Sequence, residues 1–330
     1  MTKRCLTALM MVLIMCLPHI SQGAPSPVRI GLCIYNMSDP FVNSISDAII
    51  REAGTRAEMI LQDAKNNQNL QNSQVEALLD SGVDGLILNP VDRMASVYLI
   101  RMAKARNVPV VLINREPLRE DLVLYDKAYY VGIDPSEQGR LVGEMAAGMF
   151  LADPQLDRNG DGTMQLILFK GEPGHQDAEL RTLATLDALA QSGVQVTLLE
   201  EVVAQWERRL GQQRMAALLT NLGDEVECVI SNNDEMALGA VEALKAAGWF
   251  TGRRWIPIFG IDAIPSALTA LEQGTLAGTV INDGEGIARA SLQLTELLIA
   301  GQPISTANFP WPLENKVLYL KSEPVKRQTR

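Results

Sequence analysis

Histidine and cysteine are scarce in this sequence, and their scarcity excludes whole classes of site. The 330 residues include two His, His19 and His175, and four Cys. Two of the Cys lie in the first 23 residues, which leaves Cys33 and Cys228, each in an apolar run. We expect both as buried small hydrophobic side chains. The sequence therefore has too few Cys for a disulfide framework and too few His and Cys for a zinc site built from these ligands.

Motifs of common enzymes are also missing. The sequence has no phosphate-binding loop, no G-x-S-x-G and no H-E-x-x-H. Gly284-Glu-Gly286 opens a helical stretch, but Arg289 stands where a dinucleotide fingerprint has its third Gly. A Ser–His–Asp triad would depend on His175, and no serine context supports one. We therefore expect a protein that is not an enzyme.

Positive charge is in the minority, with 29 basic against 39 acidic residues and a net charge of −10. This balance opposes nucleic-acid binding by bulk electrostatics. Lys3 and Arg4 precede an apolar stretch, and Ser21-Gln22-Gly23 offers the small residues that a signal peptidase reads. We expect residues 1–23 to be a signal peptide, because the stretch is too short to span a bilayer. Met15 before Cys16 opposes a lipid anchor, so we expect a soluble secreted protein.

Short apolar runs that alternate with longer helical patterns are abundant. The first series of runs spans 28–35, 57–61, 85–88 and 108–113. The second series spans 164–169, 194–199, 227–231, 256–261 and 278–281. This order predicts an α/β fold of two doubly wound parallel-sheet domains joined by a hinge. The predicted domains are 24–133 plus 282–316, and 134–281 plus 317–330.

Polar residues follow the strand-like runs where each run ends. In parallel sheets, ligands bind beyond the carboxyl ends of the strands. A single Asn or Asp at such a place is usually a turn residue. Five strand ends with the same chemistry predict instead a polar ring that lines one cleft. Its members are Asp39, Asn114, Asn233-Asp234, Asp262 and Asn282-Asp283.

Residues 157–165 have the spacing of a calcium loop. Asp157, Asn159 and Asp161 supply oxygen at loop positions 1, 3 and 5, and Gly162 follows at position 6. Position 12 is Leu168 rather than Glu, so the loop needs a carboxylate from elsewhere, and Glu227 is our candidate. The alternative is a plain hydrophilic turn. We favour a metal site, with Thr163 offering its carbonyl and Gln165 its side chain.

Two further groups of residues have more than one interpretation. One group is His175, Asp177 and Arg181, which would all contact a ligand in one interpretation. In the other, Asp177 is a helix N-cap that makes an ordinary i,i+4 ion pair with Arg181, and His175 is solvated. Trp206 suits the apolar face of a sugar, and Phe41 is a candidate for the opposite wall. Aromatic residues between strand and helix are as often core residues.

Together these residues resemble the periplasmic galactose/glucose-binding proteins of the type I periplasmic sugar-binding family. The resemblance runs from about residue 28 to 317. Its most specific stretches are Tyr125-Asp-Lys-Ala-Tyr-Tyr-Val-Gly132, Lys170-Gly-Glu-Pro-Gly-His175, Asn232-Asn-Asp-Glu-Met-Ala237 and Ala277-Gly-Thr-Val280. It implies a monomer that captures D-galactose or D-glucose and delivers it to the membrane component of an ABC transporter. A chemoreceptor is a second partner that the resemblance leaves open.

The resemblance also implies which residues bind the ligands. The implied sugar contacts are Asp39, Phe41, Asn114, His175, Asp177, Arg181, Trp206, Asn233, Asp262 and Asn282. The implied ligands of a structural Ca²⁺ are Asp157, Asn159, Asp161, Thr163, Gln165 and Glu227.

Three alternatives stand beside this interpretation. A relative for another monosaccharide, such as ribose or xylose, would leave the calcium loop and the set of His175, Asp177 and Arg181 unexplained. A Rossmann-type sugar enzyme would use paired acids such as Asp177 and Asp262, but it lacks its fingerprint. A transcription regulator of the same shape would carry a DNA-binding head where this chain has an export signal.

Overall fold

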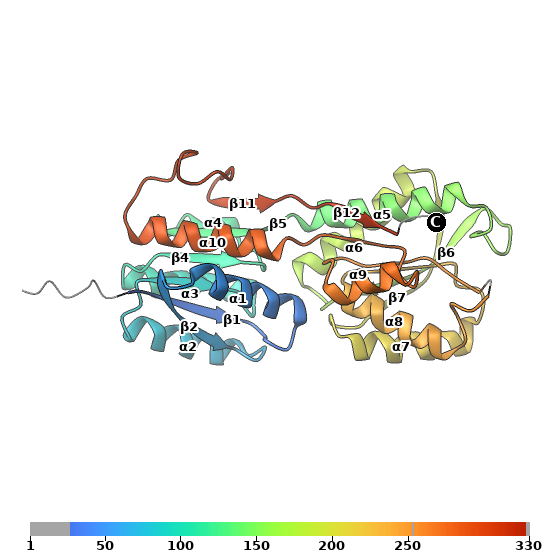
Figure 1. Ribbon diagram of the computed structural model, residues 1–330, viewed down its shortest axis with the longest axis horizontal. Helices are drawn as coiled ribbons and strands as arrows, with labels where there is room; N and C mark the ends of the chain where they lie inside the picture. Colours follow the sequence, from blue (N-terminus) through green and yellow to red (C-terminus); the bar gives the residue numbers. More distant parts are fainter. Residues whose placement is uncertain (1–26, 253, 328–330) are drawn as a thin grey trace, which may run out of the picture.

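The computed structural model describes residues 27–252 and 254–327, and the expected signal peptide at 1–23 lies outside them. These residues build two α/β domains, each around a six-stranded sheet (Figure 1). The strand orders are β11-β5-β4-β3-β1-β2 and β12-β10-β9-β8-β6-β7. Among the described strands, every pairing is parallel except that of β12 with β10. The predicted fold class is thereby confirmed.

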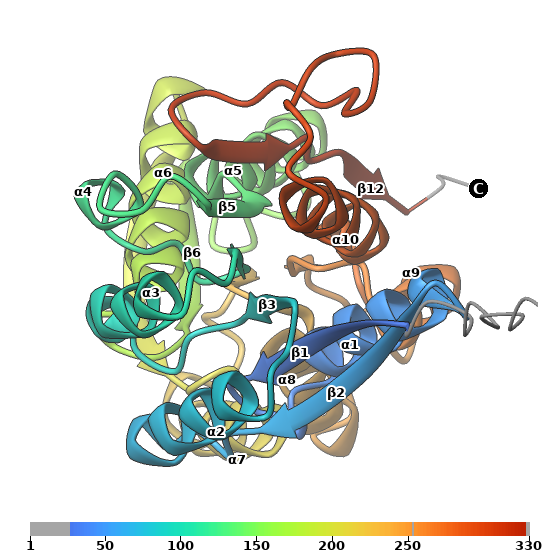
Figure 2. The ribbon, with the colours of Figure 1, turned by 90° about the vertical axis from the view of Figure 1, so that its left-hand side faces the viewer.

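The first domain contains the described elements β1 (Val28–Ile34), α1 (Pro40–Ala53), β2 (Ala57–Asp63), α2 (Gln68–Asp80), β3 (Gly85–Leu88), η1 (Arg93–Ala95), α3 (Ser96–Ala105), β4 (Val110–Ile113), α4 (Arg119–Leu122), β5 (Ala128–Ile133), α10 (Gly284–Ile299) and β11 (Val317–Leu320). Figure 2 shows α1 and α10 on one side of its sheet and α2 and α3 on the other. Because both faces are covered, the inner strands β3 and β4 are apolar and buried along their whole length.

The second domain contains α5 (Pro135–Ala152), β6 (Thr163–Lys170), α6 (Gln176–Gln191), β7 (Gln195–Val203), α7 (Arg208–Leu222), β8 (Cys228–Ser231), α8 (Asp234–Ala246), β9 (Ile258–Phe259), α9 (Pro265–Glu272), β10 (Gly278–Val280) and β12 (Pro324–Lys326). Its strand β8 is buried along its whole length, as a strand covered on both faces should be. Cys228 on this strand and Cys33 on β1 are buried free thiols, as predicted.

Within residues 27–252 and 254–327, the chain crosses between the domains at three places. The crossings follow β5, β10 and β11. The third corrects our expectation, which assigned residues 317–330 to the second domain. Val317–Leu320 pairs in parallel with Tyr130–Ile133 of the first sheet, and Val317 and Leu318 are buried there. The last crossing therefore lies beyond Leu320, because this short strand completes the edge of the first sheet before the chain leaves it.

Within the described part of the chain, none of the helices combines the length and the apolar composition needed to cross a membrane.

Candidate functional site

One cavity between the two domains gathers side chains that lie far apart in the sequence. Its volume is about 30 Å³, room for about two water molecules. It adjoins two larger spaces of about 550 and 370 Å³. The cavity is lined by Tyr35, Asp39, Phe41, Val42, Asn114, Arg115, His175, Asp177, Arg181, Trp206, Asn233, Asp262 and Asn282. The structure thus brings together all ten residues that the family resemblance implied as sugar contacts.

Two members of the predicted polar ring lie elsewhere. Asp283 caps α10, because its Oδ1 accepts a hydrogen bond from the Gly286 N–H at 2.8 Å. Asp234 is completely buried behind the cavity, at the first turn of α8. Strand-end position alone does not distinguish a side chain that points into the cleft from one that caps or braces the fold.

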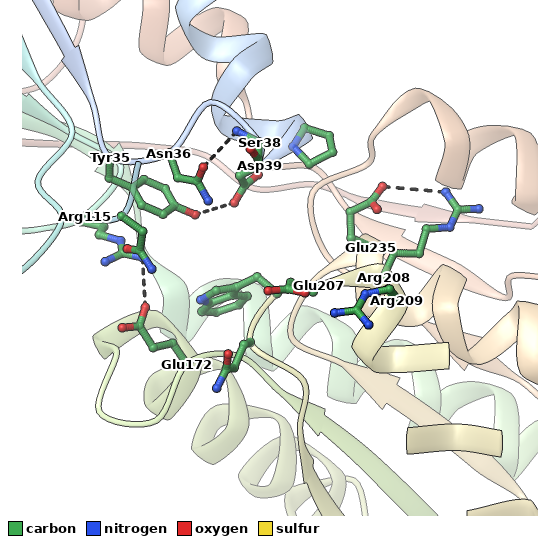
Figure 3. A pocket seen from close by; sticks show the side chains of 14 residues that line it. Tyr35, Asn36, Ser38, Asp39, Arg115, Glu172, Glu207, Arg208, Arg209 and Glu235 are labelled. Carbon is green, nitrogen blue, oxygen red and sulfur yellow. Dashed lines mark hydrogen bonds and ion pairs between the residues drawn. The ribbon is translucent and has the colours of Figure 1, made fainter. Parts of the chain in front are cut away.

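Asp39 joins the cavity to the start of α1. Its Oδ1 accepts hydrogen bonds from the backbone N–H of Phe41 and Val42, at 3.0 and 3.2 Å. Its Oδ2 accepts from the Tyr35 hydroxyl at 2.6 Å, as Figure 3 shows. A carboxylate has about four acceptor positions, so roughly one is left for a ligand. Pro40 at the first helical position fixes where α1 begins.

His175 caps α6 and is held in one tautomer. Its Nδ1 accepts a hydrogen bond from the Asp177 N–H at 3.1 Å. The ring proton must therefore be on Nε2, which is free to donate to a ligand. Burial, and after it the charges of Arg115 and Arg181, lower the pKa of His175 well below its usual value. The residue that caps α6 is thus a neutral, half-buried His175, and not Asp177 beside a solvated His.

Arg181 is the buried cation of the site. Its Nη1 donates to the Asn232 carbonyl at 2.7 Å, and its Nε donates to Gln138 Oε1 at 3.0 Å. Its guanidinium lies 3.7 Å from an oxygen of Asp177 and 4.0 Å from one of Asp262. These contacts compensate the cost of burying a charge. Burial raises the pKa of Asp177 and raises that of Asp262 to about 7, while Arg181 acts against both shifts.

Three of the eleven non-glycine residues with a positive φ in the described part of the chain line this cavity. Asn114, Trp206 and Asp262 have φ values of +63°, +68° and +121°, which residues with a side chain seldom adopt. Such conformations persist only where neighbouring contacts hold them, and they are frequent at binding sites. The Asn282 amide donates to Asp262 Oδ1 at 3.0 Å, and the Asn233 amide donates to the Trp206 carbonyl at 3.1 Å.

The aromatic walls come from opposite domains. Phe41 lies at the start of α1 and is 8 % exposed, whereas Trp206 precedes α7 in the second domain. The Trp206 indole lies directly on Gly171, since a Cβ added there would be 2.2 Å from Trp206 Cζ2. The His175 ring meets the indole edge-on, with the ring centres 5.2 Å apart. The indole is therefore fixed as a flat surface of the cavity.

Two polar residues that line the cavity, Tyr35 and Arg115, were not expected from the sequence. Arg115 Nη2 lies 3.1 Å from Glu172 Oε2 of the other domain, and its guanidinium lies 4.0 Å from the centre of the Tyr35 ring (Figure 3). A second polar contact joins the domains nearby, from the Gln176 amide to Glu116 Oε2 at 3.1 Å. Arg115 could have been predicted as a cavity residue from its position directly after Asn114, a residue already expected in the site.

The loop at 157–165 folds around its own acidic side chains. Asp157 Oδ1 accepts from the N–H of Gly160 and Asp161, at 2.8 and 3.2 Å. Glu227, which is 1 % exposed, accepts from the Gln165 N–H at 3.2 Å. In the described part of the chain, Gln165 Oε1 is buried without a hydrogen-bond partner. No three His, Cys, Asp or Glu side chains converge as a metal cluster there, so amide and carbonyl oxygens would have to complete any cation site.

Residues 30–303 match the family of the periplasmic binding protein domain. The chain belongs to this family. It is 40 % identical over 293 residues to the D-galactose/methyl-galactoside binding periplasmic protein of Haemophilus influenzae, covering 88 % of this chain and 87 % of that one. It is 31 % identical over 301 residues to the ribose import binding protein of Bacillus subtilis, covering 90 % of each.

Solved structures agree with this assignment. An ABC transporter solute binding protein from Bacillus halodurans, with bound myo-inositol, superposes with a TM-score of 0.76 and 28 % identity. The match covers 92 % of this chain and 96 % of that one. As a periplasmic binding protein, the chain is a substrate-binding protein and not an enzyme.

Proposed function

We propose that this periplasmic binding protein captures a monosaccharide, D-galactose or D-glucose, between its domains and delivers it to an ABC transporter. One observation carries the proposal: two aromatic side chains from opposite domains and a set of directional polar groups line the same cavity. The relative from Haemophilus influenzae supports the choice of hexose. Residues 1–23 would direct the chain to the periplasm.

The lining suits the chemistry of a hexose. A pyranose ring has apolar C–H faces, which match flat apolar surfaces such as Phe41 and Trp206. Its hydroxyl groups both donate and accept. They would meet the carboxylates of Asp39 and Asp262 as acceptors and the Arg181 guanidinium as donor. A site with fixed partners for each hydroxyl rejects sugars that lack one of them.

The size of the cavity implies that binding requires motion. The space where the expected contacts meet, about 30 Å³, is too small for a hexose, so we infer that the domains separate to admit the sugar and close again around it. The Arg115–Glu172 and Gln176–Glu116 contacts would form on closing, because each joins the two domains. A transporter, or a chemoreceptor as a second partner, would then recognise the closed form by its higher affinity for it.

A second candidate is a different monosaccharide, such as ribose or xylose. The ribose import binding protein at 31 % identity favours it. The two candidates share the fold and the route to a transporter, and differ in the sugar hydroxyls that the site contacts.

We propose in addition that the loop at 157–165 binds a structural Ca²⁺. The orphaned buried oxygen of Gln165 supports this, because a hard cation would supply its missing partner. The ligands would be the side chains of Asp157, Asn159, Asp161, Gln165 and Glu227 and the Thr163 carbonyl. The loop lies at the start of β6, so the ion would stabilise the domain and take no part in sugar contact.

Calorimetric titration of the mature chain tests the proposed function. Carried-over sugar is removed by partial unfolding and refolding with Ca²⁺ present. D-galactose, D-glucose, D-ribose and D-xylose are then titrated in parallel. We expect one or both hexoses to bind with a Kd of about 1 μM or lower, which corresponds to about −8 kcal/mol. Binding of a pentose alone would establish the second candidate, and no binding by any of the four would refute the assignment of the site.

A further inference from the structure

Asp234 is a completely buried acidic residue for which the sugar site gives no direct use. It is the first residue of α8 and lies behind the cavity lining. Burying a carboxylate without a partner is costly, so each of its contacts has to be accounted for. Those contacts converge on one short segment, residues 261–264, which connects β9 to α9.

The carboxylate and the backbone of Asp234 hold this segment at both ends. The Asp234 N–H donates to the Ile261 carbonyl at 2.7 Å. At the other end, Asp234 Oδ2 accepts from the Ile264 N–H at 3.0 Å. Asp234 Oδ1 accepts from the Thr279 hydroxyl at 2.7 Å, and the Thr279 oxygen accepts from the Ala263 N–H at 3.2 Å. Three consecutive peptide units are thus tied to Asp234, one through its backbone N–H, one through its carboxylate and one through the Thr279 hydroxyl that the carboxylate holds.

The segment between these ties has an unfavourable backbone. Asp262 and Ala263 have φ values of +121° and +55°. Such a conformation is unfavourable for a residue with a side chain and persists only where its surroundings impose it. Asp262 is also the member of this segment whose carboxylate lines the sugar cavity, beside Arg181 and Asn282. The direction of that carboxylate therefore depends on how firmly the segment is held.

A neighbouring glycine is adapted to the Asp234 carboxylate. A Cβ at Gly260 would lie 2.1 Å from Asp234 Oδ1, so only glycine leaves room for the acid. The partners of the carboxylate oxygens, Thr279 and Ile264, both donate hydrogen bonds to it. Burial, and after it the Asp262 charge, raise the pKa of Asp234, and these donors oppose the rise by favouring the charged form.

We propose that Asp234 is a positioning residue for Asp262: it imposes the turn that directs the Asp262 carboxylate into the sugar cavity. The inference rests on the proposed function, since it assigns Asp234 a part in sugar affinity through Asp262. Asparagine at position 234 would keep the side-chain volume. Its N–H₂ group would replace one carboxylate oxygen and would face a hydrogen-bond donor, either the Ile264 N–H or the Thr279 hydroxyl. D234N therefore disturbs the turn without opening a cavity.

A double-mutant cycle separates positioning from general support of the fold. The proteins are the wild type, D234N, D262N and the double variant, and the sugar is the one that the wild type binds most tightly among the four titrated. We expect D234N to raise the Kd at least tenfold. In the D262N background, the same change should alter the Kd less than twofold, because the carboxylate that it positions is gone.

A purely structural role would give the same loss in both backgrounds, and that result would overturn the proposal. T279V is the second test, because it removes only the hydroxyl link and is expected to raise the Kd three- to tenfold. T275V is its matched control: Thr275 is also buried, and its hydroxyl bonds the Ala270 carbonyl, away from the 261–264 segment. Its Kd should stay within twofold of the wild type.

The outcome also distinguishes this inference from the function on which it rests. If the wild type binds none of the sugars, the proposed function fails. If the wild type binds a sugar and neither D234N nor T279V changes its Kd, the site stands and the positioning role of Asp234 is wrong.

Discussion

Gly171 gives a sharp way to disturb the sugar site without removing any group from it. A Cβ at this position would lie 2.2–2.4 Å from three carbons of the Trp206 indole. Carbon atoms pack at about 3.5–4.0 Å, so G171A must push the indole away by roughly 1 Å or more. Gly171 does not have a positive φ, so alanine fits its backbone, and the three atoms nearest to the new methyl group all belong to the indole.

The size of the effect follows from the lost contact. Burial of an aromatic side chain against apolar surface contributes about 1.5–3 kcal/mol. A gap of about 0.5–1 Å forfeits a quarter to a half of the dispersion energy. G171A should therefore weaken sugar binding by roughly 1 kcal/mol, which raises the Kd about fivefold. W206A removes the whole surface and should raise the Kd more.

Calorimetric titration of these variants tests the reasoning. G193A is the control for general destabilisation, because Gly193 has a φ of +80° and no atom within 4 Å of an added Cβ. It should lower the free energy of unfolding by about 1 kcal/mol and leave the Kd unchanged. Adding G171A to W206A should change nothing further. If G171A binds sugar like the wild type while W206A does not, the indole does not act as the fixed surface described here.

Three other predictions follow from single groups. D157N should lower the Tm in the presence of Ca²⁺ and leave the sugar Kd unchanged, and a wild type that melts alike in calcium and in chelator would contradict the ion site. Burial raises the pKa of Asp262 from 3.8 to about 7, so the folded chain keeps a proton that the unfolded chain releases between these values. The free energy of unfolding should therefore fall as the pH rises through this window, and urea denaturation without sugar measures it. D262N should remove this contribution. If the free energy of unfolding depends on pH in D262N as it does in the wild type, the assignment to Asp262 is wrong. Burial also raises the pKa of Cys33 to about 12 and that of Cys228, so a thiol reagent should label them only on unfolding, and rapid labelling of the native chain would show otherwise.

Much of the fold could be predicted because its signals are local. Alternation of buried strands with helices requires only the apolar pattern along the chain, and that pattern is strong from Val28 to Val280. The strand at Val317–Leu320 was assigned to the wrong domain because four apolar residues carry no information on which sheet they complete. Pairing with Tyr130–Ile133 is a long-range contact that no local pattern encodes.

The site could be predicted in composition more than in detail. Residues at strand ends were recognised as a ring, but Asp234 turned out to brace a turn behind it and Asp283 to cap a helix. The direction of a side chain at a strand end depends on backbone angles such as the φ of +121° at Asp262, which are set by tertiary contacts. Arg115 escaped notice for the same reason, since its partner Glu172 belongs to the other domain.

The three crossings between the domains restrict how the molecule can change shape. At each end two of them are neighbours, because β11 pairs with β5 in one sheet and β12 pairs with β10 in the other. We expect the three connections to oppose sliding and twisting of the domains, so that bending about the crossings is the softest motion. The conformation of the protein is then described by one quantity, the bending angle between the two domains. A partner that touches both domains could read occupancy of the buried site from that angle without contacting the sugar.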